Sequence, residues 1–192
     1  GQMAQAEVVL HDVLRQAERQ GPAFAITAHM AACLLADTQY ERNDPDAVCE
    51  LLDQRIDIIE QMALPDAVYR ALRSLALAHR LAGRMLDGWS CVERLEDYGN
   101  RHRLERLQAH ALNIRVHWHL ADGEREPAAR ALDQLQAIDS RHERAGNSAD
   151  QEIALCASRS RVAMHVHDRR FEAAERELGR LLAACERSGR SR

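Results

Sequence analysis

The sequence predicts an all-α fold: an α-α superhelix, or solenoid, of about nine antiparallel helices with a repeat near 40 residues. Three observations predict it. Ala, Leu, Arg, Glu and Gln dominate the 192 residues, and these side chains lose little rotamer freedom in a helix. Aromatic residues make up only 4%, and with four Pro and nine Gly there is little material for strands and few helix breakers. The third observation is an internal repeat.

Each repeat begins at a turn residue, which is followed by an apolar residue or proline two positions on and a small residue five positions on. Apolar residues then recur at helical spacing, as at Leu132 and Leu135. We expect each turn residue to end a helix in the left-handed conformation, and the small residue to let the next helix approach closely. The turn residues are Gly1, Asn43, Gly83, Gly123 and Arg169, which lie 42, 40, 40 and 46 residues apart.

Local signals place the helix boundaries in chain order. Asp44 can cap a helix that begins at Pro45, and Ser148 with Gln151 forms a capping-box pattern. Other breaks are expected at Gly21–Pro22, Leu64–Pro65 and Gly99–Asn100. Together with the turn residues, these signals predict helices at residues 3–19, 22–41, 45–61, 66–82, 86–98, 102–121, 125–138, 149–167 and 170–187.

Residues 1–192 are expected to form a single domain that is long enough to bury a sizeable core. The first repeat begins at its turn and has no leading helix, while the last helix runs into Gly189–Arg192 without a polar capping repeat. Because the ends of a solenoid need a cap to cover apolar surface, we expect this chain to be a segment of a longer one.

The composition narrows the function. A net charge of −4 gives no overall signal of nucleic-acid binding, and all 26 cationic residues are arginine, which excludes a P-loop lysine or a Schiff-base lysine. No apolar run is long enough to span a membrane, so we expect a cytoplasmic protein without membrane contact. The five cysteines have no Cys-x-x-Cys spacing and are expected to be buried free thiols: Cys33, Cys49, Cys91, Cys156 and Cys185.

Four stretches carry a family resemblance: Tyr40–Leu52, Ala63–Ala67, Leu81–Arg84 and Leu120–Gly123. They resemble the tetratricopeptide-like region of MalT-like regulators, the large ATP-dependent members of the LuxR family of bacterial transcription activators. The resemblance is clearest over residues 28–138. It implies a sensor and oligomerisation segment that is not an enzyme and needs no cofactor, with ATP and DNA bound only by other domains of the parent chain.

Two His-x-His pairs, His117/His119 and His165/His167, invite a metal-site hypothesis. Residues two apart in a helix point about 200° apart around its axis, so neither pair can share a metal ion, and no metal site is predicted. His119 and His165 lie four residues before their turn residues, as His79 does. We expect this column of residues to pack against the next helix.

Five polar residues fall in columns that such repeats direct into a concave groove: Arg70, Arg73, Asn113, His117 and Arg159. They would make a mildly cationic groove that suits a small anionic effector or a protein partner. A solvated helix face, on which arginine stems cover apolar neighbours, explains the same residues. Two other functions stay open: a scaffold that forms homo-oligomers without a small ligand and, more distantly, a metal-dependent enzyme that uses the histidine-rich helices.

Overall fold

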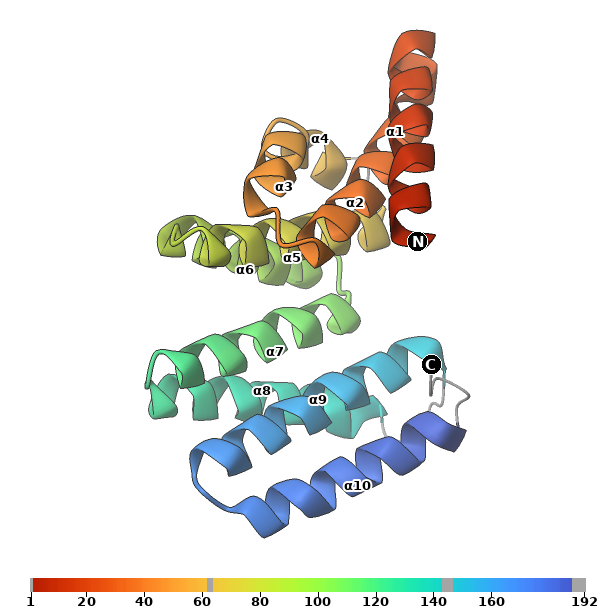
Figure 1. Cartoon of the computed structure of the whole chain (residues 1–192). Helices are drawn as coiled ribbons and strands as arrows, with labels where there is room; N and C mark the ends of the chain where they lie inside the picture. The colour runs from red at the N-terminus through yellow and green to blue at the C-terminus, as the bar shows by residue number, and fades with distance from the viewer. Residues whose placement is uncertain (1, 62–63, 143–146, 188–192) are drawn as a thin grey trace. The chain divides into compact units, whose positions relative to one another are not determined.

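The computed structural model describes residues 2–61, 64–142 and 147–187, and within these ranges the chain is helical without strands (Figure 1). The predicted all-α helical-repeat fold is confirmed. The elements are α1 (Gln2–Gln20), the short 3₁₀ helix η1 (Pro22–Phe24), α2 (Ala25–Glu41), α3 (Pro45–Leu52), α4 (Ile56–Gln61), α5 (Pro65–Leu81), α6 (Met85–Arg101), α7 (Glu105–Ala121), α8 (Arg125–His142), α9 (Ser148–His167) and α10 (Phe171–Arg187). Among these described helices, none combines the length and the apolar character needed to cross a bilayer.

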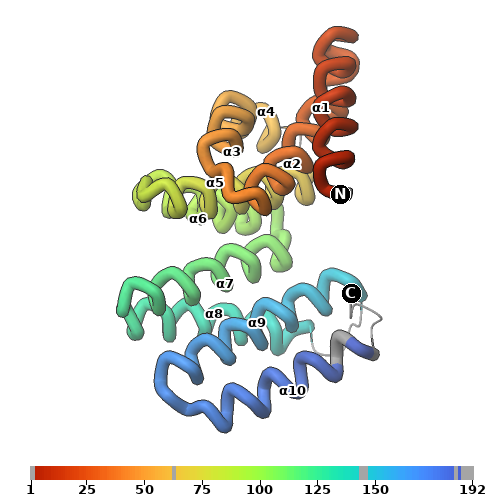
Figure 2. The backbone as a smooth tube through the Cα atoms, in the orientation of Figure 1, coloured from red at the N-terminus to blue at the C-terminus, as the bar shows by residue number. Residues whose placement is uncertain are grey.

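The chain divides into two compact units, Gly1–Leu95 and Glu96–Arg192, and the division falls within α6. In the first unit α2 packs against α1, α3 and α5, and both α3 and α4 pack against α5. In the second unit α7 packs against α8 and α9, α8 against α9, and α9 against α10; Figure 2 traces this path. In both units the first helix of one hairpin contacts the first helix of the next, as in stacked helical repeats. The expected single domain stays a prediction.

The predicted turn residues end helices in the left-handed conformation. Four of them have positive φ: Asn43 (60°), Gly83 (75°), Gly123 (79°) and Arg169 (57°). After α7, the Gly123 N–H donates to the Leu120 carbonyl (3.2 Å) and the Glu124 N–H donates to the His119 carbonyl (2.7 Å), which together form a Schellman motif. Equivalent bonds close the other three turns. Gly1 lies outside the described residues.

A fifth Schellman turn ends α6 at Arg103 (φ 55°), where the Leu104 N–H donates to the Gly99 carbonyl (2.8 Å). The break predicted at Gly99–Asn100 is therefore wrong, because α6 continues to Arg101. Gly99 is needed for close packing instead. A Cβ at this position would lie 3.1 Å from the Gln108 backbone nitrogen and 3.3 Å from the Leu104 carbonyl oxygen.

The single helix predicted at residues 45–61 is also wrong, because it splits into α3 and α4. The Leu51 carbonyl would accept from the Arg55 N–H in a continuous helix. Here it accepts from the Arg55 side chain (Nη1, 2.7 Å), while the Arg55 N–H turns back to Leu52 (2.9 Å). One arginine thus replaces a backbone bond and ends α3. The predicted helix at 22–41 likewise begins with η1 before α2.

Of the two predicted N-caps, the one at Asp44 is confirmed and the one at Ser148 is wrong by one residue. The Asp44 carboxylate accepts from the Ala47 N–H (3.1 Å) and Pro45 occupies the first turn of α3, as expected. For α9 the capping box shifts by one residue: Asn147 is the N-cap and exchanges hydrogen bonds with Asp150 (3.0 Å each). Asp150 fills the role that the sequence suggested for Gln151, since its shorter carboxylate still reaches the Asn147 N–H.

Small residues let the helices of the second unit pack closely. Ala128, five residues after its turn residue, has no exposed surface, and neither do Ala109 and Ala157. They belong to one core cluster with larger side chains such as Leu135 and Ile153, which are 0% and 1% exposed. This core fixes α7, α8 and α9 and so positions the residues discussed next.

Candidate functional site

The second unit contains a pocket of about 480 Å³ between α7, α9 and α10. Its volume lies in the range usual for small-molecule sites. Two of the predicted groove residues, His117 of α7 and Arg159 of α9, lie in its wall. The complete lining is His117, Leu120, Ala121, Arg159, Val162, Ala163, Val166, His167, Leu178 and Leu181.

His117 brings an unsatisfied polar atom to this pocket. Its Nε2 is buried and has no hydrogen-bond partner among the described residues. Burial lowers the pKa of His117, and the nearby Arg159 guanidinium lowers it further, so the ring is neutral at neutral pH. A buried ring nitrogen without a partner costs free energy, which a ligand able to bond with it would recover.

Arg159 supplies the charge. Its side chain is exposed and forms no ion pair or hydrogen bond with any other residue in the described ranges. No carboxylate lines the pocket to neutralise it. Because a guanidinium stays protonated at any physiological pH, the pocket carries one fixed positive charge.

Apart from His117, Arg159 and His167, the wall is aliphatic. Val162 and Val166 come from α9, while Leu178 and Leu181 come from α10. Leu178 remains 44% exposed, so part of this apolar surface is open to solvent. The pocket therefore offers an apolar surface to a ligand and a cationic group at Arg159.

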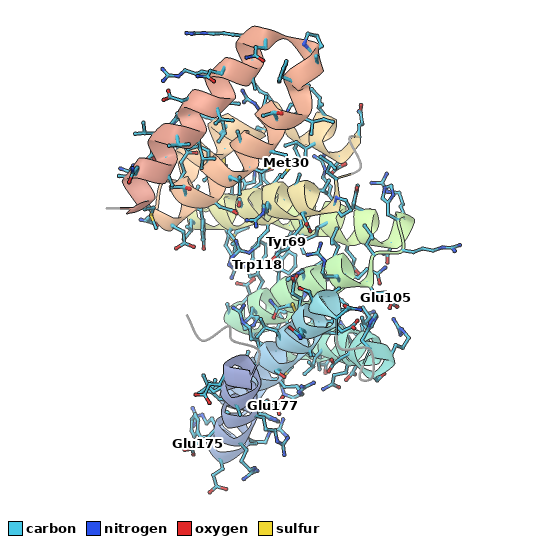
Figure 3. All side chains as sticks on the ribbon, turned by 90° about the vertical axis from the view of Figure 1, so that its right-hand side faces the viewer. Met30, Tyr69, Glu105, Trp118, Glu175 and Glu177 are labelled. Carbon is cyan, nitrogen blue, oxygen red and sulfur yellow. The ribbon has the colours of Figure 1, made fainter. Side chains whose placement is uncertain are left out.

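An ion pair holds α10, which forms one wall, against α9. Glu177 is 8% exposed and accepts from Arg161 Nε at 2.7 Å; Glu177 is labelled in Figure 3. Arg161 also donates to Ser158 (2.9 Å) and to Asp139 of α8 (3.3 Å). Sequence reasoning missed this cluster, since exposed helical faces carry many similar Arg and Glu residues. Only its position next to Leu178 ties it to the pocket.

The remaining predicted site residues lie elsewhere. Arg70 donates to Asp37 (2.6 Å), and Asp37 also accepts from the buried Ser74 hydroxyl (2.7 Å), so this arginine already has an anion. Arg73 is half-buried on the same helix, α5, of the first unit. Asn113 of α7 accepts from the Ser160 hydroxyl of α9 (3.0 Å) and lies outside the pocket lining. Of the five residues, the structure brings only His117 and Arg159 into one pocket.

A Cys–His–Glu arrangement also lies between α7 and α9. Cys156 Sγ is 3.3 Å from His110 Nδ1, and His110 Nε2 is 3.3 Å from Glu152, which also accepts from Arg106 (3.0 Å). Burial raises the pKa of Cys156 to about 12. The thiol therefore stays protonated, and a protonated buried thiol is a poor nucleophile. Cys33, Cys49 and Cys91 are buried free thiols as predicted, and the Cys185 side chain lies outside the described residues.

Cys49, Asp53 and His79 in the first unit form a group that could hold a metal ion, with ligand atoms within 4.8 Å of one another. Arg84 occupies that position, since it donates to Cys49 Sγ (3.0 Å) and to His79 Nδ1 (3.0 Å). A metal ion bound through Cys49 Sγ would have to displace the guanidinium from that sulfur. The group therefore binds the Arg84 guanidinium in this structure, and that contact competes with a metal ion.

In each histidine pair one member lines the pocket and the other does not, as helical geometry requires: His117 and His167 line it, whereas His119 and His165 do not. His117 lines the pocket, whereas His119 Nδ1 is 2.7 Å from Glu124, the residue after the turn glycine. His79 makes the same local contact with Arg84, five residues on. Sequence reasoning assigned this column to packing between helices. The structure adds that the backbone carbonyls of this column accept the hydrogen bond that spans six residues in each Schellman turn.

Compared with models of protein families, with curated proteins and with solved structures, the chain matches none of them.

Proposed function

We propose that this chain is a non-catalytic sensor segment that binds an effector in the α7/α9/α10 pocket and transmits its occupancy to a larger assembly. The observation that carries the proposal is the pairing of a buried, unsatisfied atom, His117 Nε2, with the exposed Arg159 guanidinium in one largely apolar pocket. A binding site for a small molecule combines an apolar surface with a few polar groups in this way.

The parent protein we propose is a MalT-like regulator of the LuxR family. The 40-residue spacing of Asn43, Gly83 and Gly123, each at a Schellman turn, supports a repeat region of this kind. In such a protein ATP and DNA bind to other domains, and this segment responds to the effector. The reading frame that encodes the chain is the test. We expect an ATPase module upstream and a helix-turn-helix downstream, and a frame that lacks both would refute the assignment.

The binding role itself has a separate test. Replacing Ala163 with Phe would fill the pocket, because this residue lines it from the C-terminal part of α9. We expect the variant to fold but to lose effector binding, measured by isothermal titration, while a matched Ala173→Phe change on α10, outside the lining, keeps it. Equal binding by both variants would place the ligand elsewhere.

A second function, an interaction scaffold that self-associates, is favoured by one observation. Helix α1 exposes aliphatic side chains, including Val8 (61%), Val9 (55%) and Met3 (49%). An exposed apolar face on a helix is a common site of association. Light scattering across protein concentrations, with Val8→Glu/Val9→Glu as the comparison, distinguishes the two. A strict monomer in both forms would exclude the scaffold.

A further inference from the structure

We infer that the ligand of the α7/α9/α10 pocket is a small carboxylic acid with an apolar body, whose carboxylate binds Arg159 and whose hydrocarbon part lies on α9 and α10. This inference rests on the proposed function, because it names the class of effector for the same pocket. Charge, lining chemistry and the unsatisfied histidine each contribute to it.

Charge selects an anion. Arg159 provides the only permanent charge among the lining residues, and no Asp or Glu shares the wall with it. A guanidinium binds a carboxylate through two parallel hydrogen bonds, the strongest polar contact that this lining offers. An amine of the same shape would meet like charge at Arg159 and lose this polar contact.

The aliphatic wall selects the body of the ligand. Besides His117, Arg159 and His167, the lining residues present only hydrocarbon; among the larger ones are Leu120, Val162, Val166, Leu178 and Leu181. A sugar would bury hydroxyl groups without partners, each at a cost in free energy. A di- or triphosphate carries several negative charges, whereas Arg159 is the one permanent positive charge of the lining. A single carboxylate on an alkyl chain meets neither obstacle.

His117 completes the polar end. Its Nε2 is buried without a partner among the described residues, and the Arg159 guanidinium is close enough to lower its pKa. In the Nε2–H tautomer the ring can donate to a carboxylate oxygen and so satisfy an atom that the folded chain leaves unpaired. The carboxylate of an apolar acid can therefore pair with the Arg159 guanidinium and accept from His117 Nε2–H.

The probe is octanoate, with octylamine, octanol and hexanoate as comparisons, measured by isothermal titration on the full chain. We expect octanoate to bind more tightly than octylamine and octanol. Each methylene removed should weaken binding about fourfold, so hexanoate should bind about 15-fold more weakly. Arg159→Gln should weaken octanoate tenfold or more, the usual loss for a hydrogen bond to a charged group.

Arg73→Gln is the matched control. Arg73 lies ten residues before Gly83, as Arg159 lies ten before Arg169, but on α5 of the first unit. The Arg73→Gln variant should bind octanoate with unchanged affinity. Equal effects of the two substitutions, or equal affinity for octanoate and octylamine, would overturn the carboxylate assignment.

The comparisons separate this inference from the proposed function. If octanol binds as tightly as octanoate, and Ala163→Phe abolishes both, the acid is refuted while the pocket remains a binding site. If no probe responds to Ala163→Phe, both the acid and the pocket function fail. Circular dichroism of each variant checks that the helices are intact.

Discussion

Replacing Arg103 or Arg169 with glycine should stabilise the second unit, even though each change removes a charged side chain and adds no contact. Both residues end helices at positive φ, 55° and 57°. An L-residue with a Cβ loses about 1–2 kcal/mol in this conformation, whereas glycine adopts it freely. Neither side chain forms an ion pair or hydrogen bond within the described ranges, so little is lost with it.

The size of the gain follows from two opposing terms. Relief of the left-handed strain contributes about 1–2 kcal/mol, and the greater freedom of glycine in the unfolded chain removes about 0.4–1 kcal/mol. The net gain is about 0.5–1 kcal/mol for each substitution. The reverse change, Gly123→Ala, should cost a similar amount. A Cβ there would meet nothing within 4 Å, so its cost is backbone strain alone.

Urea unfolding followed by far-ultraviolet circular dichroism measures these effects. With an m value near 2 kcal/mol per M, the midpoint should rise by about 0.3–0.5 M for each Arg→Gly variant and fall by a similar amount for Gly123→Ala. Because the substitutions lie in separate turns, Arg103→Gly and Arg169→Gly should add. A lower midpoint for both single variants would refute the view that backbone conformation governs these turns.

Three further predictions concern packing, charge and pH. Gly99→Ala should destabilise the second unit by about 1–3 kcal/mol in urea unfolding, because its Cβ would lie 3.0–3.3 Å from atoms of Gln108 and Leu104. Gly179→Ala on α10 is the control: its Cβ would meet nothing within 4 Å, and it should stabilise the unit by about 0.5–1 kcal/mol. Asp37→Ala should cost about 1–3 kcal/mol because the buried Ser74 hydroxyl loses its partner, and thermal unfolding of the Asp37→Ala/Ser74→Ala double variant should recover part of that loss. His142, hydrogen-bonded to Glu105 and Asp150 (2.6 Å each), has its pKa raised by those carboxylates, so its contribution is complete below pH 6.5 and is lost as pH rises through the raised value. The difference in urea midpoint between the wild-type chain and His142→Gln should therefore shrink from pH 6 to pH 9, and a constant difference would contradict the pairing.

The periodic features of the fold were predictable because backbone chemistry sets them. A residue with positive φ ends each of these repeats, and Asn43, Gly83, Gly123 and Arg169 could all be located from their spacing. Arg103 could not be, because nothing in its side chain marks a left-handed position and the sequence has Ala63 and Glu143, not Gly or Asn, 40 residues before and after it.

The candidate site was only partly predictable. The groove columns pointed correctly to His117 and Arg159, since helical period fixes which residues share a face. They also pointed to Arg70, which Asp37 neutralises from a different helix, and sequence alone does not reveal such a long-range partner. Leu178 had the spacing of a core residue, yet it is 44% exposed and forms a wall of the pocket.

The Schellman turns have a consequence for how arrays of this kind can grow. Each turn is closed by bonds that span at most six residues, such as the Glu124 N–H to the His119 carbonyl, and so needs no distant partner to form. A tandem copy of residues 123–168 would bring its own turn glycine, Gly123, and its own helix N-cap, Asn147. In the copy, Gly123 would follow Asp168 and take the place of the turn residue Arg169. Whole hairpins can thus be duplicated or deleted without a change in which residues of the neighbouring helices face the core. A duplication lengthens the array, and each existing turn keeps its geometry.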